Sequence, residues 1–145
     1  MNQRVIAALN TLVETCKDGE QGYRAAAGAL RNPDLRRLFT MYAAERAQFA
    51  AELSSIIRQL GGEPEISGSV AAALHRGWTN IRSAVAGRSQ RAVIAEAERA
   101  EDVAKQAYQH ALGEDLPPDV RAIVDRQYAR VREAHDRIRT MERAA

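Results

Sequence analysis

Apolar residues recur at alternating intervals of three and four residues through four long segments of this chain, and this spacing limits the fold more than any other feature. In an α-helix it places the apolar side chains on one stripe, which packs against neighbouring helices. The pattern predicts helices over about residues 2–30, 33–60, 90–112 and 119–143. Because 145 residues is the usual size of one domain, we predict a single all-α domain over residues 1–145.

The turns between these segments predict how the helices are connected. Asn32 is expected to cap the second helix, with Pro33 at its first position, and Gly61-Gly62 to end it. Short turns near residues 31–32 and 113–118 make two antiparallel hairpins. Nearly thirty residues separate the hairpins, and within them we predict a short amphipathic helix at about 70–86. The sequence therefore predicts a four-helix bundle with one long crossover between its second and third helices.

Each long helix carries a polar residue within its apolar stripe: Glu20, Glu45, Glu101 and Gln127. Glu20 lies about twelve residues before the first turn and Glu45 about thirteen after it, so both lie roughly 18 Å from that end of the hairpin. Glu101 and Gln127 are likewise level with one another near the middle of the second hairpin. We therefore predict a polar centre at mid-height in the bundle.

Two interpretations of this centre remain open. Glu20, Glu45 and Glu101 could ligate a divalent metal such as iron or manganese, with Gln48 and Gln127 as polar neighbours, because such ions accept oxygen ligands. Alternatively, the glutamates belong to a buried network with glutamines, tyrosines or arginines. Buried charge is costly unless it is paired, so such a network would fix the register of the helices.

Several short motifs carry a resemblance to a known family: DGEQGY at residues 18–23, AERAQF at 44–49, LGGEP at 60–64, HRGW at 75–78, ERAED at 98–102 and AHDRI at 134–138. The chain resembles the ferritin-like superfamily, and most closely a bacterial family of four-helix proteins catalogued as a domain of unknown function. This resemblance implies a ferritin-like bundle without an established activity.

The resemblance also bears on the metal site. The wider superfamily holds two metal ions with a glutamate from the first and third helices and a Glu-x-x-His from the second and fourth. Glu20, Glu45 and Glu101 match glutamate positions, whereas Gln48 and Arg130 stand where the histidines would be and Gln127 replaces a glutamate. The resemblance therefore implies at most a degenerate site that lacks both imidazoles.

Composition argues against several classes of protein and location. Net charge is +2, and the arginines alternate with acids at helical spacing, which is typical of a solvated, ion-paired surface. No basic block interleaved with aromatics indicates nucleic acid as a partner. A single cysteine, Cys16, no apparent signal peptide and no apolar run near the roughly 20 residues of a membrane span predict a soluble cytoplasmic protein.

The remaining polar and aromatic residues are expected to be structural. We predict that Cys16, Tyr23, Tyr42 and Tyr108 lie in the core, and that His135 lies at the surface or its boundary. No phosphate loop, Ser/His/Asp order or cysteine cluster indicates an enzyme class. We expect a structural or interaction protein with a stress-related role, forming a homo-oligomer such as a dimer through an alanine-rich face. The alternative is a metal-binding protein or vestigial oxidase.

Overall fold

A computed structural model describes residues 2–64, 78, 81, 86–87 and 89–144 of the chain. Four long helices make up most of it: α1 (Asn2–Ala29), α2 (Pro33–Gln59), α5 (Gln90–Leu112) and α6 (Pro118–Ala144). These bounds confirm the four predicted helices, and the described ranges contain no strand. The predicted short helix at about 70–86 falls almost entirely outside the described residues. No helix in the described ranges is long and apolar enough to cross a membrane.

Local sequence signals set the helix ends. The Asn32 side chain accepts hydrogen bonds from the backbone N–H groups of Asp34 and Leu35, at 2.9 and 3.2 Å, and Pro33 opens α2. The Ser89 hydroxyl accepts from the N–H of Ala92 at the start of α5. At the end of α2 the chain turns through Gly61, whose φ of 87° suits glycine.

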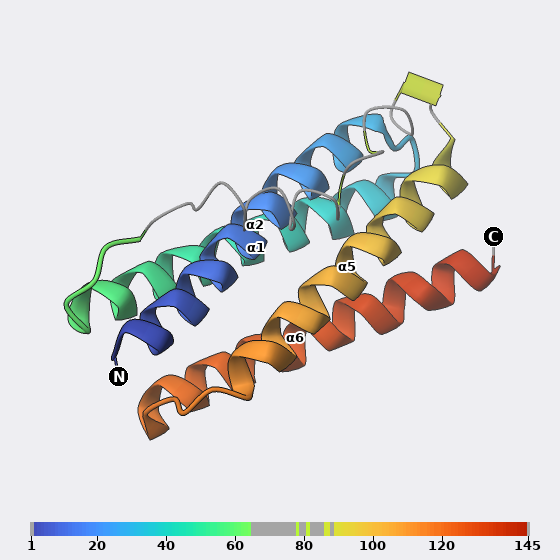
Figure 1. Cartoon of the computed structure of the whole chain (residues 1–145). Coiled ribbons are helices and arrows are strands. Elements are labelled where there is room, and N and C mark those ends of the chain that lie inside the picture. The colour runs from blue at the N-terminus through green and yellow to red at the C-terminus, as the bar shows by residue number, and fades with distance from the viewer. Residues whose placement is uncertain (1, 65–77, 79–80, 82–85, 88, 145) are drawn as a thin grey trace.

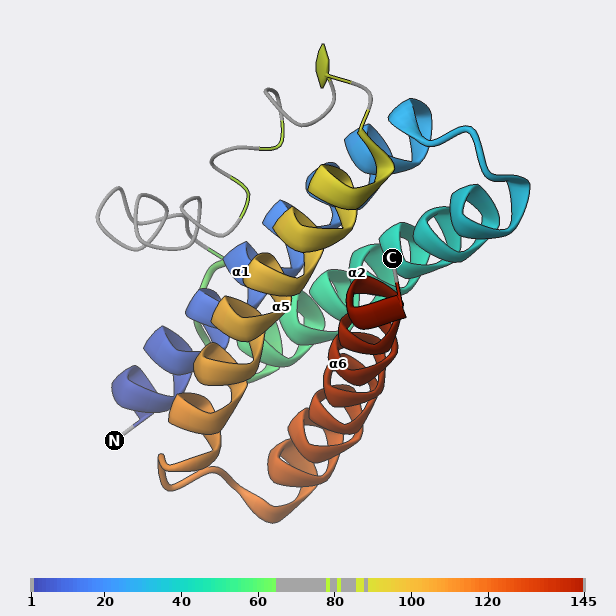
Figure 2. The ribbon, with the colours of Figure 1, turned by 90° about the vertical axis from the view of Figure 1, so that its right-hand side faces the viewer.

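The helices form two antiparallel hairpins, α1–α2 and α5–α6, which lie side by side (Figures 1 and 2). α2 ends near the start of α1, whereas α5 begins near the end of α1, so the end of α2 and the start of α5 lie at opposite ends of the bundle (Figure 1). α1 packs against α2 and α5, and α6 packs mainly against α5, with a smaller contact to α2. α2 and α5 therefore lie diagonally across the bundle from one another.

The core is divided into two clusters by a polar waist. One cluster fills the half of the bundle that contains the α5–α6 turn and includes Leu12, Leu53 and Val124. The other is aromatic, with Tyr23 packed edge-on or tilted against Phe39, Tyr42 and Trp78 at centroid distances of 5.2, 5.3 and 5.1 Å. Neither cluster contains residues 17–22, 44–48 or 101–103, which lie between the two at mid-height.

Candidate functional site

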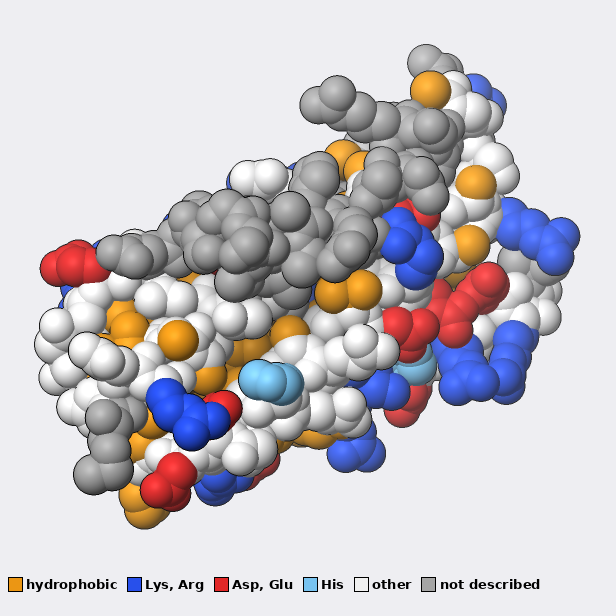
Figure 3. All heavy atoms as spheres, viewed as in Figure 1, with side chains coloured by type: hydrophobic (Ala, Val, Ile, Leu, Met, Phe, Trp, Pro, Cys, Tyr) orange, Lys and Arg blue, Asp and Glu red, His pale blue; other side chains and the backbone are white. Residues whose placement is uncertain are grey.

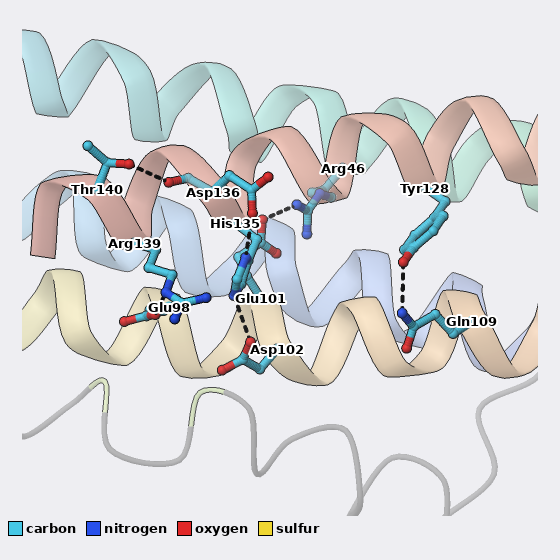
Figure 4. A network of polar contacts seen from close by, with 10 residues as sticks. All are labelled: Arg46, Glu98, Glu101, Asp102, Gln109, Tyr128, His135, Asp136, Arg139 and Thr140. Atoms are coloured by element: carbon cyan, nitrogen blue, oxygen red, sulfur yellow. Dashed lines mark hydrogen bonds and ion pairs between the residues drawn. The ribbon is translucent and has the colours of Figure 1, made fainter. Parts of the chain in front are cut away.

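A fully buried ion pair crosses the waist from α2 to α5. Nη2 of Arg46 lies 2.5 Å from Oε2 of Glu101, and the two side chains are 2% and 1% exposed (Figure 4). Burial alone would lower the pKa of Arg46, but Glu101 raises it above its usual value. Arg46 therefore stays charged, and its ion pair with Glu101 compensates for its removal from water.

Neighbouring residues shape the space for the guanidinium. A Cβ on Gly19 of α1 would lie 3.3 Å from Nη1 of Arg46, so the glycine allows the guanidinium to pass close to the α1 backbone. On the other side, the guanidinium carbon lies 5.6 Å from the centre of the Tyr23 ring, within the range of a cation–π contact. Burial, followed by the charge of Glu101, raises the pKa of Tyr23 well above its usual value, so its hydroxyl stays protonated.

A small cavity adjoins the ion pair. It holds about 10 Å³ and is lined by Thr15, Asp18, Gly19, Arg46 and Glu101 among others. That volume is close to the lower limit for one water molecule, so this cavity has no room for a larger ligand.

Glu45 and Glu20 do not join this pair. Oε2 of Glu45 accepts from Nε of Arg130 at 2.9 Å across the α2–α6 seam, and Arg130 also binds Glu133 at 3.0 Å. Glu20 pairs with Arg24 of its own helix at 2.7 Å and is one-fifth exposed. Each of the three predicted glutamates therefore has an arginine partner of its own, and Gln48 is exposed on α2.

Gln127 belongs to a hydrogen-bonded chain that includes one residue from every helix. The Cys16 sulfur lies 3.2 Å from the Tyr108 hydroxyl, which donates to Oε1 of Gln127 at 2.7 Å. Nε2 of Gln127 then donates to Glu52 at 2.8 Å, and Glu52 pairs with Arg126 at 2.5 Å at the surface. Because the Tyr108 proton goes to Gln127, the thiol of Cys16 is the donor in the first bond.

His135 forms a third polar group. Its Nε2 lies 2.7 Å from Asp102 of α5 and its Nδ1 3.0 Å from Asp136, so the imidazole links α6 to α5 (Figure 4). The hydrogen bond from His135 lowers the pKa of Asp136. The ring is buried, so the prediction of a surface or boundary position for His135 was wrong. Asp102 supplies the partner that makes burial of the imidazole acceptable.

Several assignments of the sequence analysis are confirmed. Cys16, Tyr23, Tyr42 and Tyr108 are buried in the core. Glu101 faces the core, whereas Glu98 is partly exposed and lies 3.9 Å from Arg139 (Figure 4). Within the described ranges, no three His, Cys, Asp or Glu side chains lie close enough to hold a metal ion. Glu20, Glu45 and Glu101 each form an ion pair with an arginine.

Sequence reasoning allowed for arginines in a buried network but did not single out Arg46, because most arginines alternate with acids at the spacing of a solvated surface. One signal was present: Arg46 continues the spacing Phe39, Ala43, Ala50 and Leu53, all of which are buried. That stripe lies one residue away from the one drawn through Glu45. A charged residue at its centre indicates a buried partner elsewhere in the chain.

Comparison with known proteins places the chain in a family. A search of curated proteins finds no match. Residues 4–114 match the model of a family described as a domain of unknown function, DUF2383. The match covers α1, α2 and α5, and α6 lies beyond it. Since the matched range is well over half of the chain, the protein belongs to the DUF2383 family.

Proposed function

We propose that this protein is a structural or interaction module built on a ferritin-like bundle, and that its polar centre fixes the packing of the helices. The Arg46–Glu101 pair is the observation that carries the proposal. A guanidinium already neutralises the most deeply buried carboxylate, in the position where a metal centre would need a cation. A second positive ion there would be repelled by Arg46.

The other polar contacts fit the same role. Glu45–Arg130 and Glu52–Arg126 hold α2 to α6, where the two helices have little direct packing. The chain from Cys16 to Glu52 links all four helices in one register. Buried polar groups that are satisfied in one arrangement alone disfavour helix slippage. Such a bundle presents a fixed surface to a partner, which is what an interaction module requires.

A second candidate function is a degenerate metal site at Glu20, Glu45 and Glu101. One observation favours it: within the described ranges, Oε1 of Glu45 is buried and accepts no hydrogen bond. A carboxylate oxygen with free lone pairs suits a hard divalent cation such as manganese or iron. The Arg24, Arg130 and Arg46 side chains would first have to release their carboxylates.

Metal analysis separates the two candidates. The purified protein is assayed for bound metal and titrated with Mn²⁺ and Fe²⁺, alongside Glu45→Gln and the control Glu133→Gln, since both glutamates bind Arg130. The structural role predicts no stoichiometric metal in any of the three proteins. Stoichiometric metal that disappears in Glu45→Gln and persists in Glu133→Gln would establish the second candidate and overturn the first.

A further inference from the structure

The two ends of the bundle carry opposite charge. The end with the α1–α2 turn bears five exposed arginines that form no ion pair within the described residues: Arg31, Arg36, Arg91, Arg137 and Arg143. Of the acidic side chains described at this end, Asp34 is paired with Arg37 and Glu98 with Arg139. Glu142 is the remaining carboxylate that could offset the charge of these arginines. Figure 3 shows Lys and Arg side chains gathered at the end where α6 terminates. We call this the arginine end.

The opposite end, with the α5–α6 turn, is acidic. Its exposed carboxylates without an ion pair in the described ranges are Glu63, Asp115, Asp119 and Asp125, and we call it the acidic end. Glu114 there is paired with Arg4. Among the described residues at this end, Arg58 and Arg121 are the arginines that form no ion pair with a carboxylate. Arg121 donates to the backbone oxygens of Leu112 and Glu114, at 2.9 and 2.7 Å, and so fixes the shape of the turn.

The ends also differ in shape. The arginine end has a hollow of about 320 Å³ between α2, α5 and α6. Its lining includes the apolar Leu35, Ile94 and Met141 and the polar Asn32, Asp34 and Gln90, and Asp34 is paired with Arg37. The acidic end instead presents two prolines, Pro117 half-buried and Pro118 exposed, between Asp115 and Asp119. Leu116 is buried beneath them and anchors the turn. A rigid apolar tip between acids is thus matched by a partly apolar hollow beside arginines.

We infer that the acidic end of one copy of this chain docks into the arginine end of a second copy. Within one molecule the two ends are about 40 Å apart, the length of a 27-residue helix, and the Debye length is about 10 Å at 0.1 M salt. The opposite charges therefore cannot neutralise one another within a single chain. The helix dipoles do not supply the polarity, because two helices start and two end at each end of the bundle.

The geometry of this contact defines the kind of assembly. Because it joins two different surfaces, it is heterologous, and repetition gives a closed ring or an open chain of copies. The inference rests on the proposed interaction role and names the partner. Its residues do not overlap the waist, so metal analysis and self-association can fail separately.

Sedimentation velocity over a concentration series tests the inference in the full chain. We expect the sedimentation coefficient to rise with protein concentration at about 0.01 M salt and to stay at the monomer value at about 1 M salt. The reason is that the Debye length is about 30 Å at the lower salt concentration and about 3 Å at the higher one. The dissociation constant should increase about tenfold or more over this range.

Charge reversal identifies the two surfaces. Two double variants are made, Asp115→Arg/Asp119→Arg at the acidic end and Arg91→Glu/Arg143→Glu at the arginine end. Each should remain monomeric at low salt, and an equimolar mixture of the two should associate. Lys17→Glu/Lys105→Glu is the matched control, because it changes net charge as the arginine-end variant does but lies at mid-bundle. It should associate like the unmodified chain, and circular dichroism checks that every variant is folded.

Several results would overturn the inference. They are a monomer under all conditions, association that is insensitive to salt, loss of association in the Lys17/Lys105 control, or failure of the mixed variants to associate. Binding of a polyglutamate peptide by a chain that does not self-associate would assign the arginine end to an acidic partner instead, and would equally overturn the contact between copies.

Discussion

Arg46 and Glu101 join the two helices that lie diagonally across the bundle, with Nη2 of the arginine 2.5 Å from Oε2 of the glutamate. They are 55 residues apart in sequence. The pair lies between the two core clusters, the one rich in aromatic residues and the other mostly aliphatic. Gly19 of α1 leaves room for its guanidinium. The position of the pair makes it the first target for mutation.

Removing one member of the pair should be far more damaging than removing both. Glu101→Ala leaves Arg46 charged, buried and unpaired, and we expect a loss of about 3–5 kcal/mol in the free energy of unfolding. Arg46→Met/Glu101→Leu, which replaces both by apolar groups, should be neutral or more stable by about 1–4 kcal/mol. Urea unfolding of the single and double variants measures both. A loss below about 1 kcal/mol for Glu101→Ala would contradict the charged buried pair.

The same substitution at two glycines of α1 should have opposite effects. A Cβ on Gly22 would lie 2.2 Å from the Trp78 ring, whereas nothing lies within 4 Å of one on Gly28. Gly28→Ala should stabilise the protein by about 0.5–1 kcal/mol, because alanine favours the helix. Gly22→Ala should destabilise it and shift the fluorescence of Trp78, the single tryptophan. Equal stability of the two variants would show that Trp78 does not pack on Gly22.

The helices were predictable from sequence because their determinants are local. Apolar spacing, the Asn32 cap with Pro33, and Gly61 each act within a few residues, and the helix bounds follow from them. The inward direction of Glu101 was predictable too, because this residue falls within the apolar stripe of its own helix, beside the buried Ala97 and Ala104. In each case the signal lies on one helix and needs no knowledge of its neighbours.

The partners of the polar residues were not predictable in the same way. Glu45 and Arg46 are adjacent on α2, and both fall on the broad face that its apolar stripe covers. Which of them enters the core depends on Glu101 and on the space beside Gly19, both far away in sequence. His135 is buried for a similar reason, since Asp102 of α5 supplies its partner. An apolar stripe predicts which face of a helix is buried, whereas the ion pairs between helices depend on how the helices pack in the assembled fold.

Stability should fall at alkaline pH because of Cys16. Burial raises the pKa of its thiol from 9.0 to about 11, so the folded state holds this proton more tightly than the unfolded chain. The resulting stabilisation is complete below pH about 9 and is lost as pH rises towards 11, by about 2–3 kcal/mol. The free energy of unfolding, measured as a function of pH for the wild type and Cys16→Ser, tests this prediction. Serine does not titrate in this pH range, and the tyrosines are common to both proteins. Parallel curves would contradict the prediction.

Two tyrosines provide a matched test of the hydrogen-bonded chain. The Tyr108 hydroxyl is buried between Cys16 and Gln127, whereas the Tyr128 hydroxyl accepts from Gln109 at the surface, at 2.8 Å (Figure 4). Tyr108→Phe leaves Oε1 of Gln127 buried without a donor, so we expect a loss of about 1–3 kcal/mol in the free energy of unfolding. Tyr128→Phe should change it by less than about 0.5 kcal/mol, since water replaces the lost bond. Gln127→Met in the Tyr108→Phe background should recover part of the loss, because the unpaired amide is then gone. If both tyrosine variants lose the same amount, ring packing rather than the chain from Cys16 to Glu52 determines their stability.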